Sequence, residues 1–327
     1  MAARSKTKPV PAAPTNLMSA YQAAFAEWEA IRGYSPRTIE HRRFALARFT
    51  AWCAERGIER PQDVTRPILE RYQRHVHHHR KKNGQPLGVA AQVNLLIPIR
   101  AWFKWLARHN HILWNPAADL ELPRQPRRLP KALLSIAEVE TALAHADPAT
   151  GAGLRLRALL ETLYSTGIRR MEAANLTLHD IDTERGALMV RQGKGGKDRL
   201  IPIGARACAW VERYRNEVRP LLVAGRDDYT LFLDDAGQKY DPGRLGELVK
   251  RHLDAAGITQ PGSCHLFRHA MATHMLEGGA DIRFIQAMLG HEDLNTTQIY
   301  TQVSLTKLKQ IHEATHPARL HRRAAET

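Results

Sequence analysis

Apolar residues recur every three or four positions in the first part of this chain, which is the period of a helix with one buried face. Tyr21, Phe25, Trp28 and Ile31 form the first such stripe, and Gly33 ends it. The pattern predicts an amphipathic helix that begins near residue 19 and packs its aromatic side chains inward.

Three more helices are expected before residue 110. Ser35-Pro36 combines an N-cap residue with a proline in the first turn, and Gly57 lies past the end of the helix that follows. Another helix should begin around Pro67, and a fourth should cover residues 89–108. These segments predict a small bundle composed only of helices.

The second part of the chain is predicted to be mostly helical, with one small antiparallel sheet. Ser135 and Glu138 have the spacing of a capping box. Short apolar runs at 187–190 and 200–203 flank a glycine-rich turn, which is typical of a β-hairpin. Further helices are expected over residues 136–146, 152–166, from Arg169 onward, 205–219, 243–256, 266–278 and 281–289.

These patterns divide the chain into five segments and predict a mainly α protein. Residues 1–16 mix proline, alanine and basic residues without a period, which favours a disordered basic arm. A helical domain over 17–114 is followed by a linker at 115–131, which carries four prolines. A second domain should cover 132–303, and a tail with leucines at helical spacing should occupy 304–327.

The positive charge is concentrated in the first part of the chain. The net charge is +15, and residues 1–131 hold 23 basic and 9 acidic side chains, which amounts to +14. Such a surface is suited to a polyanion, because its cations neutralise backbone phosphates and release counterions. A basic face that serves only solubility is the alternative reading of charge alone.

Cysteine content and hydropathy argue against a secreted or membrane protein. Cys53, Cys208 and Cys264 are odd in number and far apart, so neither a disulfide framework nor a cysteine zinc site is expected. The first residues lack the apolar core of a signal peptide, and no run of about 18 apolar residues occurs. We therefore expect a cytoplasmic protein without membrane association.

The segment 265–303 holds the side chains that point most directly to chemistry. His265 and Arg268 lie three residues apart at the start of a predicted helix, so both project from one face. His291 follows within Leu-Gly-His, and Tyr300 comes nine residues later. Each feature taken alone is weak evidence, because histidines, arginines and tyrosines at such spacings usually serve structure.

Together these motifs resemble the tyrosine recombinase, or phage integrase, family, and within it the bacterial Xer recombinases. The resemblance spans almost the whole chain and includes all six of the family's catalytic positions in order. The matching residues are Arg169 in TGIRRME, Lys194 in GKGGK, His265 and Arg268 in HLFRH, His291 in LGHED and Tyr300 in TTQIYT. Where the family usually carries an apolar residue, this chain has Arg170, so Arg169 is assigned to the site by its place after Thr-Gly-Ile.

The resemblance implies a SAM-like DNA-binding domain, a catalytic domain and a chemistry that these residue types suit. Tyr300 would attack a DNA phosphodiester and form a 3′-phosphotyrosine. Arg169 and Arg268 would hold the non-bridging oxygens with planar, permanently charged forks. His265 would act as the base and Lys194 as the acid toward the leaving oxygen.

Two further residues complete the predicted site. His291 would donate another hydrogen bond to the phosphate. Glu172, three residues after Arg169 on the same helical face, would orient that guanidinium.

No cofactor is implied, because the energy of the broken bond is kept in the phosphotyrosine and the sequence lacks a P-loop and a carboxylate cluster. His265 and His269 have zinc-ligand spacing, but the glutamate of the H-E-x-x-H motif is missing.

The implied function is site-specific recombination through a Holliday junction. The partners would be double-stranded DNA at the nucleoid and further subunits, in a homotetramer or a heterotetramer with a related recombinase. The tail after Tyr300 would dock on a neighbouring subunit. An inactive DNA-binding accessory protein and a topoisomerase-like relaxing enzyme are the alternatives. Dimer resolution, as in Xer proteins, and integration of a mobile element are not distinguished by the sequence.

Overall fold

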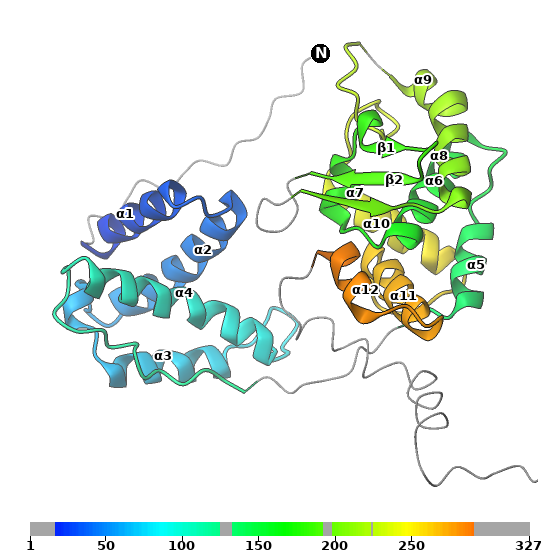
Figure 1. Ribbon diagram of the computed structural model, residues 1–327. Helices are drawn as coiled ribbons and strands as arrows, with labels where there is room; N and C mark the ends of the chain where they lie inside the picture. Colours follow the sequence, from blue (N-terminus) through cyan, green and yellow to red (C-terminus); the bar gives the residue numbers. More distant parts are fainter. Residues whose placement is uncertain (1–16, 125–132, 192–197, 224, 291–327) are drawn as a thin grey trace, which may run out of the picture. The chain divides into compact units, whose positions relative to one another are not determined.

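The computed structural model describes four stretches of the chain, which are residues 17–124, 133–191, 198–223 and 225–290. They belong to two compact units, which divide between Arg127 and Arg128, inside the predicted linker (Figure 1). The predicted arm at 1–16 and the predicted tail at 304–327 lie outside the described residues.

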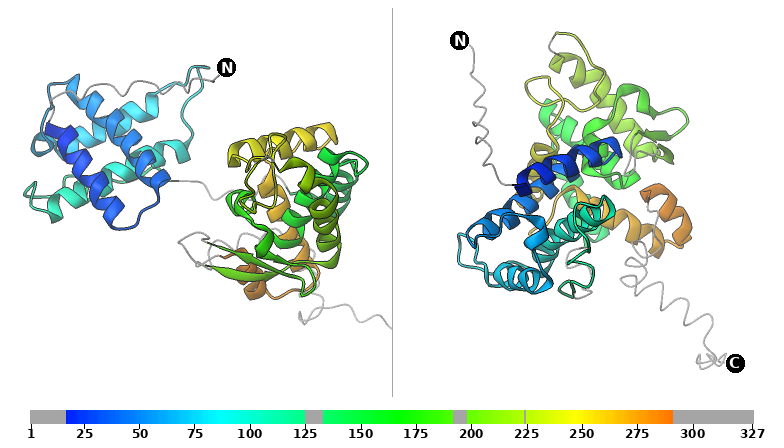
Figure 2. Two further views of the ribbon diagram at one scale, coloured as in Figure 1. Left: turned by 90° about the horizontal axis from the view of Figure 1, so that it is seen from above. Right: turned by 90° about the vertical axis from the view of Figure 1, so that its left-hand side faces the viewer.

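The first unit is a bundle of helices, as predicted, and Figure 2 shows it from two further directions. Its helices are α1 (Leu17–Ile31), α2 (Pro36–Ala54), α3 (Arg66–His78) and α4 (Val89–Arg108), with a 3₁₀ turn at Pro61–Asp63. The second helix begins where the sequence indicates, because the Ser35 hydroxyl accepts a hydrogen bond from the backbone N–H of Thr38 at 3.2 Å.

Aromatic side chains from different helices form the core of this unit. Phe49, Tyr72, Trp102 and Phe103 are fully buried, and the ring of Phe49 meets those of Tyr72 and Phe103 edge to face. The predicted stripe on α1 is correct for Phe25 but wrong at its last position. Ile31 ends the helix and is 79% exposed.

The predicted linker begins too early, because part of it belongs to the first core. Ala117 and Leu120 are buried there, and the Asn115 side chain accepts from the Ala117 N–H at 3.0 Å to close a turn. The Gln73 side chain, on α3, donates to the Glu121 carbonyl at 2.9 Å. Prolines without an apolar period predict a linker here, but two apolar residues in the segment are enough to anchor its first part.

The second unit is mostly helical and carries one small sheet, which confirms the predicted fold class. Its helices are α5 (Ile136–Ala144), α6 (Gly151–Thr166), α7 (Arg170–Asn175), α8 (Ala205–Arg213), α9 (Arg219–Leu222), α10 (Pro242–Ala255), α11 (Cys264–Glu277) and α12 (Ile282–Leu289), with a 3₁₀ turn at Leu178–Asp180. The helix expected over 205–219 is interrupted by a π-helical segment at Tyr214–Val218.

Helix α6 is the centre of this unit. It packs against α5, α8 and α11, and most of its side chains are buried, including the polar Thr162 and Thr166. Each threonine hydroxyl donates to the carbonyl one turn earlier, so neither polar group is left unsatisfied.

The sheet is antiparallel in the order β1-β2-β3, with strands β1 (Ile181–Asp182), β2 (Ala187–Val190) and β3 (Arg199–Pro202). The predicted hairpin consists of the second and third strands, with Leu188 opposite Ile201. Their buried side chains face the helical core, while Leu200 points to solvent. The end of α12 packs against β3, so the hairpin and the last described helix are neighbours.

Cysteines and hydropathy give no sign of a cross-linked or membrane-spanning structure in the described part. The three cysteines are free thiols and are buried. Burial raises the pKa of Cys53 to about 12 and that of Cys264 to about 11, so both thiols are inert. No helix in the described stretches reaches the length and hydropathy that crossing a bilayer requires.

Replacing Phe49 with alanine should destabilise the first unit by about 3–5 kcal/mol, because the ring leaves a cavity between three helices. Phe44→Ala, on the same helix, is the matched control, since Phe44 is 58% exposed and its loss should change stability by less than about 0.5 kcal/mol. Urea unfolding followed by tryptophan fluorescence measures this. Five of the six tryptophans lie in the first unit. Equal effects of the two substitutions would contradict the assigned core.

Candidate active site

The Thr-Gly-Ile sequence turns the chain so that Arg169 starts a new helix. Gly167 ends α6 with φ +62°, a left-handed conformation that favours glycine, and a Cβ there would lie 2.0 Å from the end of the Met271 side chain, which would have to move. Ile168 is buried and anchors the turn. Arg169 then takes the N-cap position of α7 in extended conformation, with its side chain partly exposed.

Glu172 holds Arg169 through both the backbone and the side chain. One carboxylate oxygen accepts from the backbone N–H of Arg169 at 2.8 Å. The other accepts from its guanidinium at 2.9 Å. This is the pair that the sequence places three residues apart, and the carboxylate also caps the first turn of α7.

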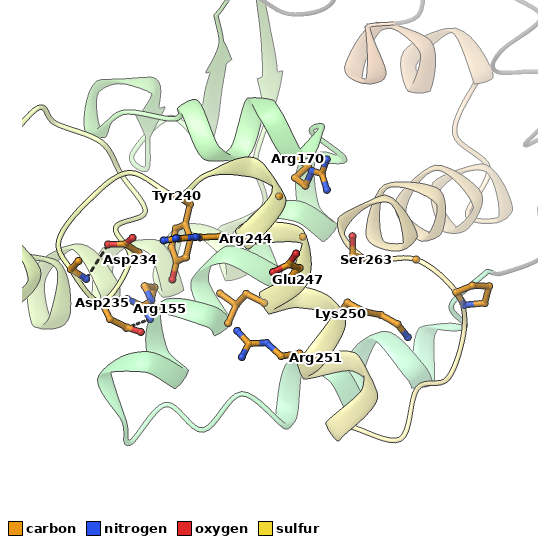
Figure 3. Close-up of a pocket in the computed structure, with 16 residues that line it drawn as sticks. Arg155, Arg170, Asp234, Asp235, Tyr240, Arg244, Glu247, Lys250, Arg251 and Ser263 are labelled. Atoms are coloured by element: carbon orange, nitrogen blue, oxygen red, sulfur yellow. Dashed lines mark hydrogen bonds and ion pairs between the residues drawn. The ribbon is translucent and has the colours of Figure 1, made fainter. Parts of the chain in front are cut away.

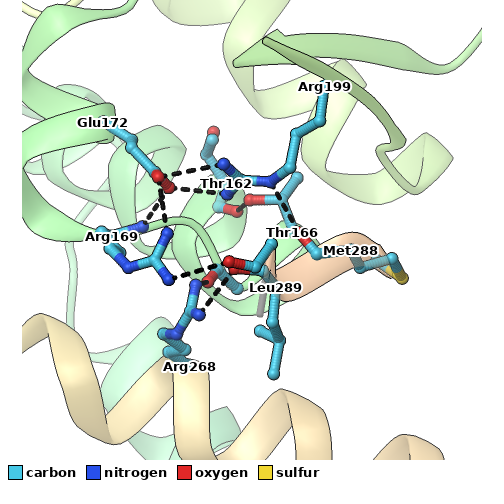
Figure 4. A network of polar contacts seen from close by, with 10 residues as sticks. Thr162, Thr166, Arg169, Glu172, Arg199, Arg268, Met288 and Leu289 are labelled. Atoms are coloured by element: carbon cyan, nitrogen blue, oxygen red, sulfur yellow. Dashed lines mark hydrogen bonds and ion pairs between the residues drawn. The ribbon is translucent and has the colours of Figure 1, made fainter. Parts of the chain in front are cut away.

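A second guanidinium, which sequence reasoning missed, binds the same carboxylate. Arg199, the first residue of β3, donates to the two oxygens of Glu172 at 3.0 and 2.7 Å (Figure 4). Burial alone would raise the pKa of Glu172, but the hydrogen bonds from Arg199 and Arg169 and the charge of Arg199 outweigh it and lower that pKa to about 2. The carboxylate is therefore ionised at any working pH.

Arg268 is buried, and it joins the ends of two helices. It projects from α11 and donates to the carbonyl of Gly167 at 2.6 Å and to that of Leu289 at 2.8 Å. The residue is 5% exposed, and these two bonds orient its guanidinium before any substrate arrives. One side chain therefore forms hydrogen bonds to both the Thr-Gly-Ile turn and the end of α12.

The last carbonyls of α12 are bound by three different arginines. Met288 O accepts from Arg199, Leu289 O from Arg268, and Gly290 O from Arg169, at 2.9, 2.8 and 3.3 Å. The last carbonyls of a helix have no donor within the helix and carry the negative end of its dipole. Three guanidiniums therefore converge on the point from which the chain continues to His291.

His265 stands at the edge of this cluster, on the first turn of α11, and its side chain is exposed. Its pKa is lowered, first by partial removal of the ring from water and then by the positive charges of Arg268, Arg170 and Arg169. The ring is therefore neutral at pH 7, which is the state that a base requires.

The side chains of Arg169 and Arg170 contact different parts of the second unit. Arg169 reaches Glu172 and Gly290, as described above. Arg170 lies among the residues that line an open pocket along α10 (Figure 3). It crosses α10 at Gly246, where a Cβ would be 2.6 Å from its guanidinium. The geometry favours Arg169 as the arginine of the cluster, in agreement with the sequence assignment.

Three of the predicted site residues fall outside the described residues, namely Lys194, His291 and Tyr300. The described neighbours of two of them are nevertheless informative. Lys194 belongs to the connection between β2 and β3, five residues before Arg199, where β3 begins. His291 directly follows Gly290, whose carbonyl Arg169 binds. What the structure brings together is Arg169, Glu172, Arg268 and His265, with Arg199 added.

A metal site on α11 finds no support in the described part of the chain, where no group of three or more potential ligands gathers. A third histidine of α11, His274, forms a hydrogen bond with the Tyr164 hydroxyl at 3.0 Å, which gives it a structural role.

Comparison with known proteins decides the family. The sequence model of the phage integrase family matches residues 133–307, more than half of the chain. The chain belongs to the phage integrase family. Tyrosine recombinase XerC 2 of Ralstonia nicotianae is 56% identical over 307 residues, or 94% of this chain and 88% of that protein. Tyrosine recombinase XerD of Pseudomonas putida is 37% identical over 286 residues, or 88% of this chain and 93% of that protein.

Solved structures agree on the fold of this tyrosine recombinase. The XerH site-specific recombinase bound to its palindromic difH substrate, after cleavage, matches 86% of this chain and 81% of that chain, with a TM-score of 0.69 and 22% identity. A lambda integrase tetramer bound to a Holliday junction matches 90% of this chain and 81% of that chain, with a TM-score of 0.65 and 18% identity. At these identities the likeness establishes the fold alone.

The stability of the recombinase should depend on the charge of Glu172 in acid. Because the folded pKa of about 2 lies below the ordinary 4.5, this carboxylate contributes stability in full above pH 4.5 and loses it as pH falls toward 2. At about 1.4 kcal/mol for each pH unit, the contribution is roughly 3 kcal/mol.

Unfolding of the parent and of Glu172→Gln, followed by circular dichroism between pH 2 and 6, measures this contribution. The difference in unfolding free energy between the two proteins should shrink as the pH falls from 4.5 to 2. A difference that stays constant over this range would show that the buried ion pair contributes nothing that depends on protonation.

Proposed function

We propose that this chain is a site-specific DNA recombinase that cuts and rejoins strands through Tyr300. One observation carries the proposal. Arg169 and Arg268 bind adjacent carbonyls, those of Gly290 and Leu289, at the start of the segment that holds His291 and Tyr300. Two permanent cations thus lie together where the chain continues toward His291 and Tyr300, which supports a phosphate site at this point.

The arginines would stabilise the transition state of the attack. A phosphodiester is anionic, and the five-coordinate transition state gathers more charge on the non-bridging oxygens. Guanidiniums that are oriented beforehand by protein carbonyls and by Glu172 need little rearrangement to meet that charge. Loss of one such donor typically costs about 10²–10³ in rate.

Proton transfers would complete the reaction. An unperturbed tyrosine has a pKa of about 10, so Tyr300 needs a base, and the neutral His265 is suited to that role. Lys194, in the turn of the hairpin, would protonate the leaving 5′ oxygen, and His291 would donate to the phosphate. The bond energy is kept in the phosphotyrosine, so the strand can be rejoined to another 5′-OH without ATP or a metal ion.

The partners would be double-stranded DNA and other subunits. The basic first unit would supply affinity for the backbone, and four subunits on two duplexes would pass through a Holliday junction. We propose that residues 304–327 dock on a neighbouring subunit, which is either a second copy or a related recombinase. Action on chromosomal or plasmid DNA would place the protein at the nucleoid.

A covalent adduct is the direct test of this function. The probe is a nicked duplex whose site has been recovered, by binding to the wild-type protein, from a pool of random duplexes. The wild type should become linked to the 3′ side of the nicked strand, whereas Tyr300→Phe should bind equally well and give no adduct. Binding without any adduct in the wild type would instead indicate an accessory DNA-binding protein.

The pH dependence of adduct formation should report the charge of His265. Because the pKa of His265 lies below the ordinary 6.5, the rate should fall about tenfold per pH unit only at pH values below 6.5. His265→Asn should lower the rate at pH 7.5 by about 10²–10⁴ and remove this acid limb.

His274→Gln serves as the control for this experiment. The pKa of His274 is also lowered, chiefly by burial, but its ring is bonded to Tyr164. The acid limb should survive in this variant. If the limb also survived in His265→Asn, another group would have to be the base.

A further inference from the structure

Arg199 makes three directed hydrogen bonds to two different parts of the second unit. Its two terminal nitrogens bind the two oxygens of Glu172, and its Nε donates to Met288 O at 2.9 Å (Figure 4). The side chain is 13% exposed, so these bonds are sheltered from water. Glu172 lies 27 residues away along the chain and Met288 lies 89 residues away.

The backbone at Gly290, directly after α12, leaves room for the Arg199 side chain. Gly290 has φ +62°, and a Cβ there would lie 3.2 Å from three atoms of the Arg199 side chain. The glycine therefore permits both the left-handed end of α12 and the close approach of Arg199. Arg169 binds the carbonyl of this same glycine.

Arg199 and Arg169 are coupled through one carboxylate. Oε1 of Glu172 accepts from both guanidiniums, at 3.0 and 2.9 Å. Without Arg199, Glu172 loses its bidentate partner and keeps only its bonds to the backbone N–H and the guanidinium of Arg169, so its carboxylate is less firmly oriented. The position of Arg169 thus depends on a residue with which it shares a carboxylate oxygen.

We propose that Arg199 is a positioning residue for the cleavage reaction, which acts through Glu172 on Arg169. This inference rests on the proposed function. Arg199 also starts the strand that follows the Lys194 turn. One side chain therefore joins strand β3, the carboxylate that holds Arg169 and the end of α12.

The chemistry requires an arginine at this position. Three donors that diverge from one rigid plane reach a carboxylate on one side and a carbonyl on another, which a single ammonium group does not do. Arg199→Lys keeps the charge beside Glu172 and loses the fork. Arg199→Met loses both and keeps much of the apolar stem.

A double-mutant cycle with the nicked duplex described above tests the proposal in the full chain. Single-turnover adduct formation is measured for the wild type, Arg199→Met, Glu172→Gln and the double variant, and duplex affinity is measured for each. We expect Arg199→Met to lower the rate by about 10- to 100-fold, because small misplacements of catalytic groups carry losses of that size. Affinity should stay within about twofold of the wild type.

The double variant distinguishes action through Glu172 from an independent effect. If Arg199 acts through that carboxylate, the double variant should be no slower than Glu172→Gln alone by more than about threefold. Losses that multiply in the double variant, or an affinity that falls in parallel with the rate, would overturn the proposal.

Two further variants keep the result interpretable. Arg206→Met is the matched control, since Arg206 also binds a buried carboxylate, that of Glu161 at 2.9 Å, and should react at the wild-type rate. If Arg199→Met does not fold, Arg199→Lys carries the test, and a rate within twofold of the wild type refutes the proposal. Absence of an adduct in the wild type would remove the proposed function and this inference together, whereas normal rates in both Arg199 variants remove the inference alone.

Discussion

A single buried carboxylate, that of Glu172, determines how the guanidiniums of Arg169 and Arg199 are arranged. Arg169 and Arg199 approach each other closely because this one negative charge lies between them. Burying an ion is costly unless it is paired and hydrogen-bonded, and Glu172 meets that condition with bonds from two guanidiniums and a backbone N–H. The cluster as a whole still has more positive than negative charge, so it is suited to receive a phosphate.

The end of helix α12 is the second constraint on the site. Its last carbonyls need donors from outside the helix, and three arginines supply them. These bonds orient the guanidiniums before substrate arrives, which is the property that makes electrostatic stabilisation effective. The same bonds determine where the chain leaves the helix toward His291. In the proposed reaction, the groups that cap the helix would therefore also form the preorganised phosphate site.

The two units differ in how their charged side chains are distributed. Residues 1–131 carry nearly all the excess positive charge. In the second unit many arginines are paired internally, as in the ion pairs of Arg155 with Asp235, Arg219 with Asp227 and Arg206 with Glu161. Such pairs cancel in the net charge and stabilise the fold locally. The first unit is thus suited to bind a polyanion broadly, and the second to hold a few charges in defined places.

The sequence by itself determined the features that short windows encode. Helix α4 has the bounds that its period predicts, and the Arg169–Glu172 pair follows from helical spacing. Both depend on neighbours within a turn or two. The six motif positions likewise identified the family, although all six stay predictions as site residues.

Tertiary structure alone decided the rest, because packing brings distant segments together. Arg199 reached Glu172 and Met288 only through the docking of β3 against α12, and no local pattern marks it. The same reason explains the linker, where Leu120 has no periodic neighbours but finds a core built by other helices. Local periodicity encodes which face of an element is buried, whereas the partner on that face is chosen by the whole fold.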